Sequence, residues 1–241
     1  MLIQRIILWT GTLLSTASVT AAPEATYQTR SIEGWTVAIN KRLLQGPEAD
    51  RTAQSLELLA GQLKEIVRVV PAPAVAKLRE VKLWFSPEYP NVSPRAEYHP
   101  GAGWLRDHGR DPTMARGIEF TNVRVFEAET KRMPNFALHE LAHAYQDQVL
   151  AGGFANVQIK GLYERAKAGG SYDKVERWHG NGRPNTHERA YAITNPMEYF
   201  AEATEAFFTQ NDFYPFNREQ LKQHDPEMEQ LLAKLWGVAA R

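Results

Sequence analysis

The residues best suited to chemistry in this chain are His139, Glu140 and His143, which form the pattern His-Glu-x-x-His. In a helix, which turns by about 100° per residue, the two histidines lie about 40° apart and share one face. Two imidazoles on one face can bind a single Zn²⁺ ion through their ring nitrogens. Glu140 beside them can take a proton from a water molecule on that ion. The opposite face of the helix is apolar, with Leu138, Leu141, Ala142, Tyr145 and Val149.

This pattern is rarely produced by chance. With 7 histidines and 28 acidic residues in 241 positions, about 0.02 matches are expected per chain of this composition. A catalytic zinc site also needs a third protein ligand and an open fourth position. The metzincin class requires glycine and histidine at positions where this chain has Gln146 and Val149, and it is therefore excluded. The later histidines lie in predicted loops or helix ends and remain alternative ligands: His179, His187 and His224.

A second predicted helix, over residues 196–210, offers a better third ligand. Glu198, Glu202 and Glu205 fall on one side of it, opposite Met197, Phe200, Phe207 and Phe208. We expect Glu198 to complete the zinc site and Glu202 to orient a histidine ring from the second coordination shell. The alternative is structural: after Asn195 as N-cap and Pro196, Glu198 completes a capping box. In that case Glu202 and Glu205 belong to an ordinary solvated face.

These two segments together resemble a known family, the gluzincin peptidases typified by the catalytic domain of anthrax lethal factor and by the Pro-Pro endopeptidases. The resemblance rests on His-Glu-Leu-Ala-His at 139–143 and on Tyr191-x-x-x-Asn195-x-x-Glu198-x-Phe200-Ala201-Glu202, and it covers residues 117–210. It implies one Zn²⁺ per chain, held by His139, His143 and Glu198. It further implies that Glu140 is the general base and that Tyr191 assists the oxyanion. A tyrosine that only packs in the core is the alternative for Tyr191.

The remaining pattern predicts an α+β fold, in which strands come first and helices follow. We expect a zincin-like domain in which a small mixed sheet packs on the active-site helix and the glutamate-bearing helix. A substrate would add as a strand at a sheet edge formed by Gly117–Val123 or by the region of Glu97. Residues 160–186 resemble an insertion, and His99, His108 and Arg110 are taken as solvated loop residues. The predicted strands lie within 27–39, at 81–85, near 97 and at 117–123, and the predicted helices at 50–70, 135–150, 196–210 and 225–237.

The first 21 residues have the form of a cleavable signal peptide. A short positively charged start precedes an apolar run at 6–14, and Val19-Thr20-Ala21 supplies small residues before the cut. The apolar run is shorter than the roughly 20 residues that cross a bilayer. We therefore expect residues 22–241 to form one exported domain, secreted or periplasmic, without stable membrane insertion.

Composition narrows the class of partner. Equal numbers of basic and acidic residues, 28 each, argue against a nucleic-acid-binding surface. The absence of cysteine excludes disulfides and thiolate metal sites. The sequence thus predicts an exported zinc endopeptidase that acts on a peptide or protein substrate. Two alternatives stay open: a noncatalytic secreted binding protein with a structural metal site, and hydrolysis of another amide such as a cell-wall peptide bridge.

Overall fold

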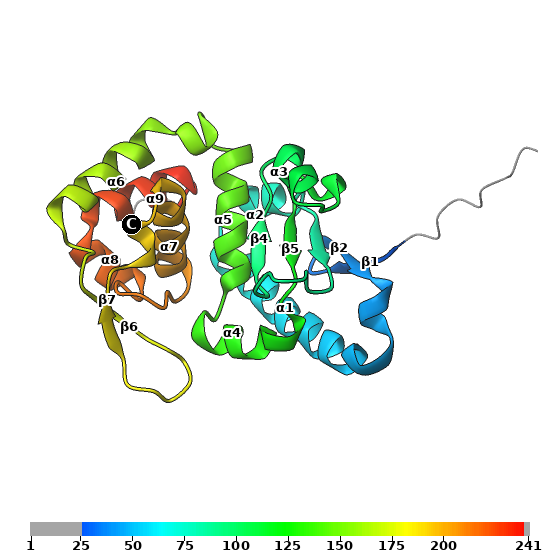
Figure 1. Cartoon of the computed structure of the whole chain (residues 1–241). Coiled ribbons are helices and arrows are strands. Elements are labelled where there is room, and N and C mark those ends of the chain that lie inside the picture. The colour runs from blue at the N-terminus through cyan, green and yellow to red at the C-terminus, as the bar shows by residue number, and fades with distance from the viewer. Residues whose placement is uncertain (1–25, 239–241) are drawn as a thin grey trace, which may run out of the picture.

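The structure, a computed structural model, describes residues 26–238. The predicted signal peptide lies outside these residues. A five-stranded sheet forms the first half of the described chain, in the order β1-β2-β3-β5-β4 (Figure 1). The neighbours β2, β3 and β5 run parallel, while β1 and β4 pair antiparallel at the two edges. The strands are β1 (Tyr27–Ile32), β2 (Trp35–Asn40), β3 (Leu83–Phe85), β4 (Ala96–Tyr98) and β5 (Ile118–Phe120).

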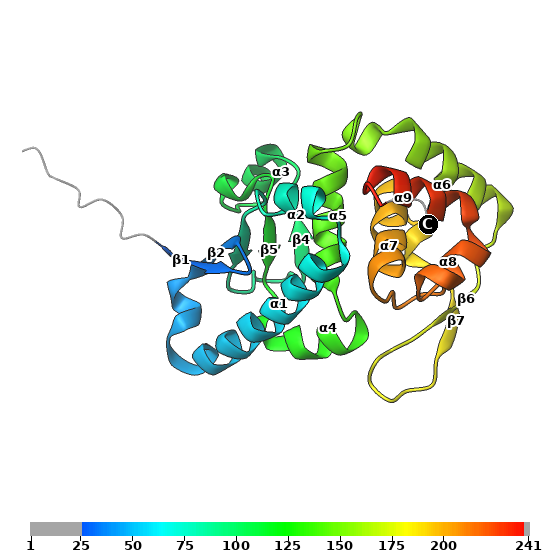
Figure 2. The ribbon, with the colours of Figure 1, turned by 180° about the vertical axis from the view of Figure 1, so that it is seen from behind.

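Alternation along the strands divides the apolar side chains between the two faces of the sheet. Leu83 and Phe85 point into the main core, whereas Trp84 joins a small cluster with Ala38 and Leu105 on the other face. This is the two-residue period of an extended strand. The small cluster lies under α3 (Ala102–Asp107), and the main core lies under α1 (Ala49–Val69), α2 (Ala72–Leu78) and α5 (Phe136–Gln148) (Figure 2).

The second half of the chain is mainly helical and packs against α5. Its central helix, α7 (Pro196–Phe208), lies beside α5 (Figure 1). The last described helix, α9 (Pro226–Leu235), also contacts α5. Trp236, which follows α9, stacks on Tyr145 of α5 with 4.0 Å between ring centroids. The elements are α6 (Val157–Gly169), β6 (Val175–Arg177), β7 (Thr186–Glu188), α7 (Pro196–Phe208), α8 (Arg218–His224) and α9 (Pro226–Leu235).

The α+β class and the longer predicted elements are confirmed, but several shorter predictions are wrong. The strand expected at Gly117–Val123 ends at Phe120, because a 3-10 turn at Val123–Val125 follows it. The insertion-like run 160–186 is ordered as most of α6 and the β6–β7 hairpin. Helices α2, α3, α4 (Phe126–Arg132) and α8 were not predicted, since six or seven residues are too few to show a helical period. Among residues 26–238, no helix has both the length and the apolar character needed to span a membrane.

Candidate metal centre

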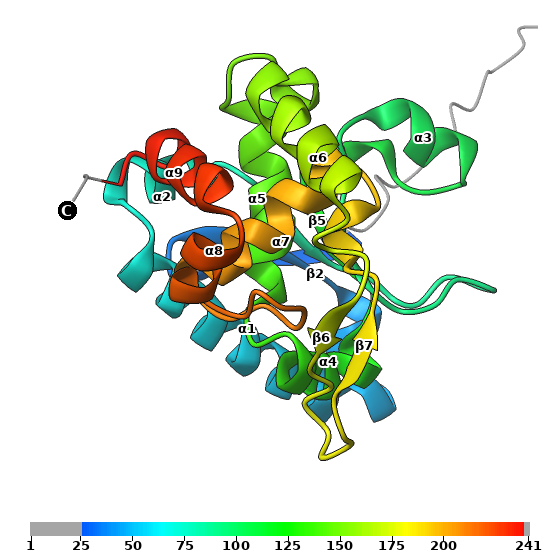
Figure 3. The same ribbon diagram turned by 90° about the vertical axis from the view of Figure 1, so that its left-hand side faces the viewer.

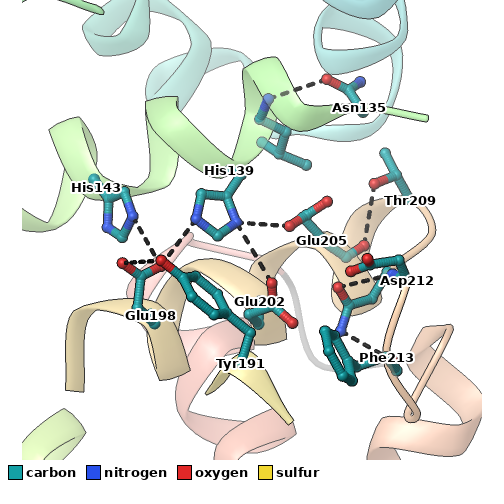
Figure 4. A network of polar contacts seen from close by, with 12 residues as sticks. Asn135, His139, His143, Tyr191, Glu198, Glu202, Glu205, Thr209, Asp212 and Phe213 are labelled. Carbon is teal, nitrogen blue, oxygen red and sulfur yellow. Dashed lines mark hydrogen bonds and ion pairs between the residues drawn. The ribbon is translucent and has the colours of Figure 1, made fainter. Parts of the chain in front are cut away.

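Helix α5 is held at its start by contacts that fix the direction of its histidines. The side chain of Asn135 caps the helix by accepting a hydrogen bond from Leu138 N at 3.0 Å. Its amide nitrogen donates to Gln62 O of α1 at 3.0 Å, and Gln62 Oε1 accepts from Ala137 N at 2.9 Å. These hydrogen bonds fix the rotation of α5 about its own axis relative to α1. In this orientation His139 and His143 face α7 (Figure 4).

Helix α7 supplies the carboxylate that meets both imidazoles. Asn195 Oδ1 caps α7 by accepting from Met197 N and Glu198 N at 2.9 and 3.0 Å. The Glu198 carboxylate, however, turns towards the histidines, and its Oε2 lies 3.0 Å from His139 Nε2 and 3.3 Å from His143 Nε2. The N-cap is therefore real, and Glu198 still directs its side chain to the predicted site.

The spacing of these three atoms fits a zinc ion. Ligand atoms about 2.0–2.1 Å from a tetrahedral centre lie about 3.3 Å from one another, close to the two distances from Glu198. Burial would raise the pKa of the Glu198 carboxyl, but hydrogen bonds to His139 and His143 hold it well below its ordinary value. Glu198 is therefore a carboxylate at neutral pH, as a ligand must be. The donor set can hold a metal ion.

The second nitrogen of His139 meets a different glutamate from the one expected. Glu205 Oε1 lies 2.7 Å from His139 Nδ1, whereas Glu202 Oε1 lies 3.8 Å from it. Both glutamates are buried, with 2% and 0% of the residue exposed for Glu202 and Glu205. The alternative of a solvated face is therefore wrong. The reason is that the polar side of α7 packs on the polar side of α5 rather than facing water (Figure 4).

Burial dominates the protonation of these two carboxyls. It raises the pKa of Glu205 to about 7, against the lowering effect of the hydrogen bond with His139. Burial, together with Asp212 and Glu205, raises the pKa of Glu202 well above its ordinary value. For His139, burial would lower the pKa, but Glu198 and Glu205 raise it well above 6.5. The region behind the histidines is thus rich in carboxyl groups and holds protons near neutral pH.

Glu140 and Tyr191 both line the space beside the histidines. Glu140 Oε2 accepts a hydrogen bond from Tyr98 N of β4 at 2.8 Å, which directs the carboxylate to the sheet edge. Tyr191, in a 3-10 turn before α7, is 48% exposed, so the alternative of a core tyrosine is wrong. Its hydroxyl donates to Glu198 Oε1 at 3.4 Å, and partial burial raises its pKa.

Two cavities flank the centre along α5, and both are lined by His139, Glu140 and Tyr191. We call the first the aromatic cavity; it has a volume of about 350 Å³ and is further lined by Tyr98, Pro100, Phe154 and Met197. We call the second the arginine cavity; it has a volume of about 430 Å³ and is further lined by Arg132, Met133, Phe136, Arg177 and Phe213. Arg95 and Ala96 border both. The glutamates and tyrosine predicted from the sequence therefore open onto substrate-sized space.

A second group of metal-ligating side chains lies behind β4 and was not predicted. Glu97, His99 and Glu119 bring three donor atoms within 4.8 Å of one another. Arg110 already occupies the middle of this group, with NH1 2.6 Å from Glu97 Oε2 and 3.2 Å from Glu119 Oε2. It is therefore an ion-pair network rather than a second metal centre. The expectation that His99 and Arg110 are solvated is wrong, because both are buried by the pairing of β4 with β5.

The remaining alternative ligands lie elsewhere. His179 Nε2 is hydrogen-bonded to Thr186 Oγ1 at 2.9 Å, and the ring of His224 packs against Tyr172 and Tyr214. Within residues 26–238, neither these two nor His187 belongs to a group that could hold a metal. Comparison of the chain with protein-family models, with curated proteins and with solved structures finds no match.

Proposed function

We propose that this protein is an exported, zinc-dependent peptidase with a zincin-like fold. His139, His143 and Glu198 would hold one Zn²⁺ per chain, beside the two cavities. The observation that carries this proposal is the convergence of Glu198 Oε2 on both Nε2 atoms, at 3.0 and 3.3 Å. Three protein ligands beside open space are typical of catalytic rather than structural zinc sites.

When bound, zinc supplies a Lewis acid that polarises a carbonyl group and lowers the pKa of water towards about 7. Glu140 takes the proton from the attacking water and returns it to the leaving amine. The backbone N–H of Tyr98 holds that carboxylate at the edge where a substrate carbonyl would lie. The hydroxyl of Tyr191, which stays protonated because its pKa is raised, donates to the developing oxyanion.

The rival function is a binding protein that keeps the metal as a structural clip. A clip requires neither Glu140 nor Tyr191, and it usually closes the fourth position with a protein ligand. Both side chains instead line the cavities beside the histidines. The placement of these two side chains favours an enzyme. The same geometry serves any amide, so a cell-wall peptide bridge belongs among the substrates to be tried.

The experiment begins with the purified protein without residues 1–21, reconstituted with zinc and dialysed. We expect one zinc per chain and cleavage within a mixed peptide library. Glu140→Gln should keep the zinc and abolish cleavage, whereas Glu198→Gln should lose both. Failure of the unaltered protein to retain zinc would refute the proposal. Zinc retention with no cleavage of peptides or cell-wall peptides would support the binding protein.

A further inference from the structure

The free edge of β4 faces the candidate centre and offers backbone groups to a substrate. Arg95 and His99 make their backbone hydrogen bonds to the β5 side, at 2.9 and 3.0 Å. Because these groups alternate in direction along a strand, the N–H and C=O groups of Ala96 and Tyr98 point away from β5. Tyr98 N–H is bound to Glu140. An extended peptide can therefore add at the backbone of Ala96 and at the carbonyl of Tyr98.

The direction of such a peptide follows from the direction of β4. The start of β4 lies at the arginine cavity with Phe136, and its end lies at the aromatic cavity with His143. Antiparallel pairing is the more stable arrangement of two strands. A peptide paired in this way passes from the aromatic cavity to the arginine cavity. The part of the substrate that follows the scissile bond therefore lies in the arginine cavity.

The arginine cavity is bordered at Arg132 by a contact between the two halves of the chain. The β6–β7 hairpin reaches α4 (Figure 3), and Gly180 at its tip packs so closely that a Cβ atom there would lie 2.1 Å from Lys131 O. Beside it, Arg132 NH1 of α4 lies 2.5 Å from Asp212 Oδ2, in the segment after α7. A chain bound along β4 meets this contact at the Arg132 side of the cavity.

This side of the cavity carries guanidinium groups from two separate elements. Arg132 and Arg177 share the buried carboxylate of Asp212, at 2.5 and 3.6 Å. Their other partners, Glu129 and Glu188, are a third or more exposed, and solvent screens those pairs. The cavity is lined by the three arginines Arg95, Arg132 and Arg177 and by four carboxyl groups, those of Glu129, Glu140, Glu202 and Asp212.

Two further observations point to an anionic ligand. The buried Nε–H group of Arg177 makes no hydrogen bond, and its ion-pair partner Asp212 Oδ2 lies 3.6 Å away. Arg95, which also lines the cavity, lies 3.7 Å from Glu97, whose other oxygen is bound to Arg110 at 2.6 Å. Its Nε–H donates to Ser93 O at 3.1 Å, so Arg95 has only a weak carboxylate partner. Guanidinium groups bind carboxylates through charge-assisted hydrogen bonds.

Resting on the peptidase function proposed above, we infer that the arginine cavity binds the C-terminal carboxylate of a peptide substrate. The protein then hydrolyses a peptide bond close to the C-terminal end and releases a short fragment. This narrows the endopeptidase expected from the sequence to an enzyme that acts near a free chain end. An acidic side chain offers the same carboxylate chemistry, and the test separates it from the chain terminus.

Binding is measured by calorimetry on the zinc-loaded Glu140→Gln protein, so that no probe is consumed. The first two probes are N-acetylated pentapeptides of alanine with a central phenylalanine, one a free acid and the other a C-terminal amide. A third is the amide with glutamate as its fourth residue, and a fourth is the free acid lengthened by four C-terminal alanines. Arg95→Gln and Arg177→Gln are added to this background, with Arg124→Gln, an exposed ion-paired arginine outside both cavities, as control.

We expect the free acid to bind about tenfold or more tightly than the amide, as for a hydrogen-bonded charge. Arg95→Gln and Arg177→Gln should reduce this preference, and Arg124→Gln should keep it. The lengthened peptide also ends in a free carboxylate and should bind with its own last residues in the cavity. Equal binding of acid and amide, or no binding of the lengthened peptide, would overturn the inference. An internal glutamate that restores the affinity of the amide would overturn the assignment to the chain terminus. Arg95 is half-exposed, so its variant gives an answer even if Arg177→Gln does not fold.

Cleavage by the unaltered protein separates this inference from the function on which it rests. Cuts confined to the last few bonds of free-acid peptides agree with both. Cleavage that is the same for free-acid and amide peptides would support the peptidase function and refute the carboxylate site. Carboxylate-dependent binding without any cleavage refutes the peptidase and sustains the site, and no binding of any probe refutes the site.

Discussion

Glu205 Oε1 lies 2.7 Å from His139 Nδ1, so this imidazole has a carboxylate at each of its two nitrogens. A carboxylate at Nδ1 fixes the ring rotation and leaves Nε2 to face a metal ion. His143 differs, because its Nδ1 is buried without a hydrogen-bond partner. Helix α7 therefore holds the first histidine at both nitrogens, whereas it meets the second only through the contact of Glu198 with Nε2.

Replacing Glu205 with glutamine should weaken zinc binding by about 10- to 100-fold, the usual effect of losing such a partner. The matched control is Glu202→Gln on the same helix, which should have a smaller effect because its oxygen lies 3.8 Å from Nδ1. Competition with a chromogenic chelator measures both affinities. The visible spectrum of the cobalt-substituted protein reports whether the ligand geometry has changed. A larger loss of affinity in Glu202→Gln would show that the two roles are reversed.

Removal of the Tyr191 hydroxyl should slow peptide hydrolysis without changing the fold. Tyr191→Phe is expected to lower kcat by about 10²-fold, as for loss of one oxyanion donor, and to leave KM nearly unchanged. The side chain is half-exposed and its hydroxyl has only the 3.4 Å contact with Glu198, so thermal stability should be unaltered. Steady-state kinetics and a melting curve test this. A loss of zinc in this variant would instead indicate that the tyrosine supports the ligand.

The sequence was sufficient to predict which three side chains come together in the candidate metal centre but not the contact at Nδ1. Helical periodicity places Glu198, Glu202 and Glu205 on one side of α7. Which of them meets Nδ1 of His139 depends on how α7 packs against α5, and one helical wheel carries no information about its neighbour. Glu205, seven residues after Glu198, is two turns further along the helix and reaches the ring that Glu202 does not.

The polar core behind β4 was missed for a related reason. His99 and Arg110 stand among glycines and prolines, a composition typical of loops. Their burial follows from the pairing of β4 with β5, which brings Glu119 opposite Glu97 and creates a buried negative site for Arg110. Such pairing joins residues far apart in sequence, and no local pattern in either segment indicates it.

The metal-free protein should become less stable as pH rises, partly through Glu202. Its pKa is higher in the folded chain than the ordinary value of 4.5, so the folded state favours the protonated form. The stability from this group is complete below about pH 4.5 and is lost as pH rises through the folded pKa. Glu202→Gln mimics the protonated form, and its melting temperature relative to the unaltered protein should increase from pH 5 to pH 8. A difference that is constant with pH would contradict this.

The ion pairs of Arg110 should contribute far more to stability than a surface pair. The side chains of Arg110 and Glu119 are 4% and 0% exposed, so Arg110→Met leaves a buried carboxylate without its charge partner. We expect a loss of about 3–5 kcal/mol in the free energy of unfolding. Arg124→Gln, which removes an exposed pair with Glu88, should cost no more than about 1 kcal/mol. Urea denaturation compares the two, and equal losses would show that Glu119 is not dependent on Arg110.

The contact between the β6–β7 hairpin and α4 can be tested with two glycines in one loop. Gly180 and Gly182 both have positive φ, 64° and 78°, so alanine strains the backbone at either position. Only at Gly180 does a Cβ atom also clash, at 2.1 Å from Lys131 O, while nothing lies within 4 Å at Gly182. Gly182→Ala should cost about 1 kcal/mol and leave the hairpin on α4.

Gly180→Ala should cost more and push the hairpin away from α4, because Lys131 O belongs to the backbone of a helix and cannot move aside. Urea denaturation of the two variants compares the losses in the free energy of unfolding. Equal losses would show that the hairpin does not depend on this contact with α4.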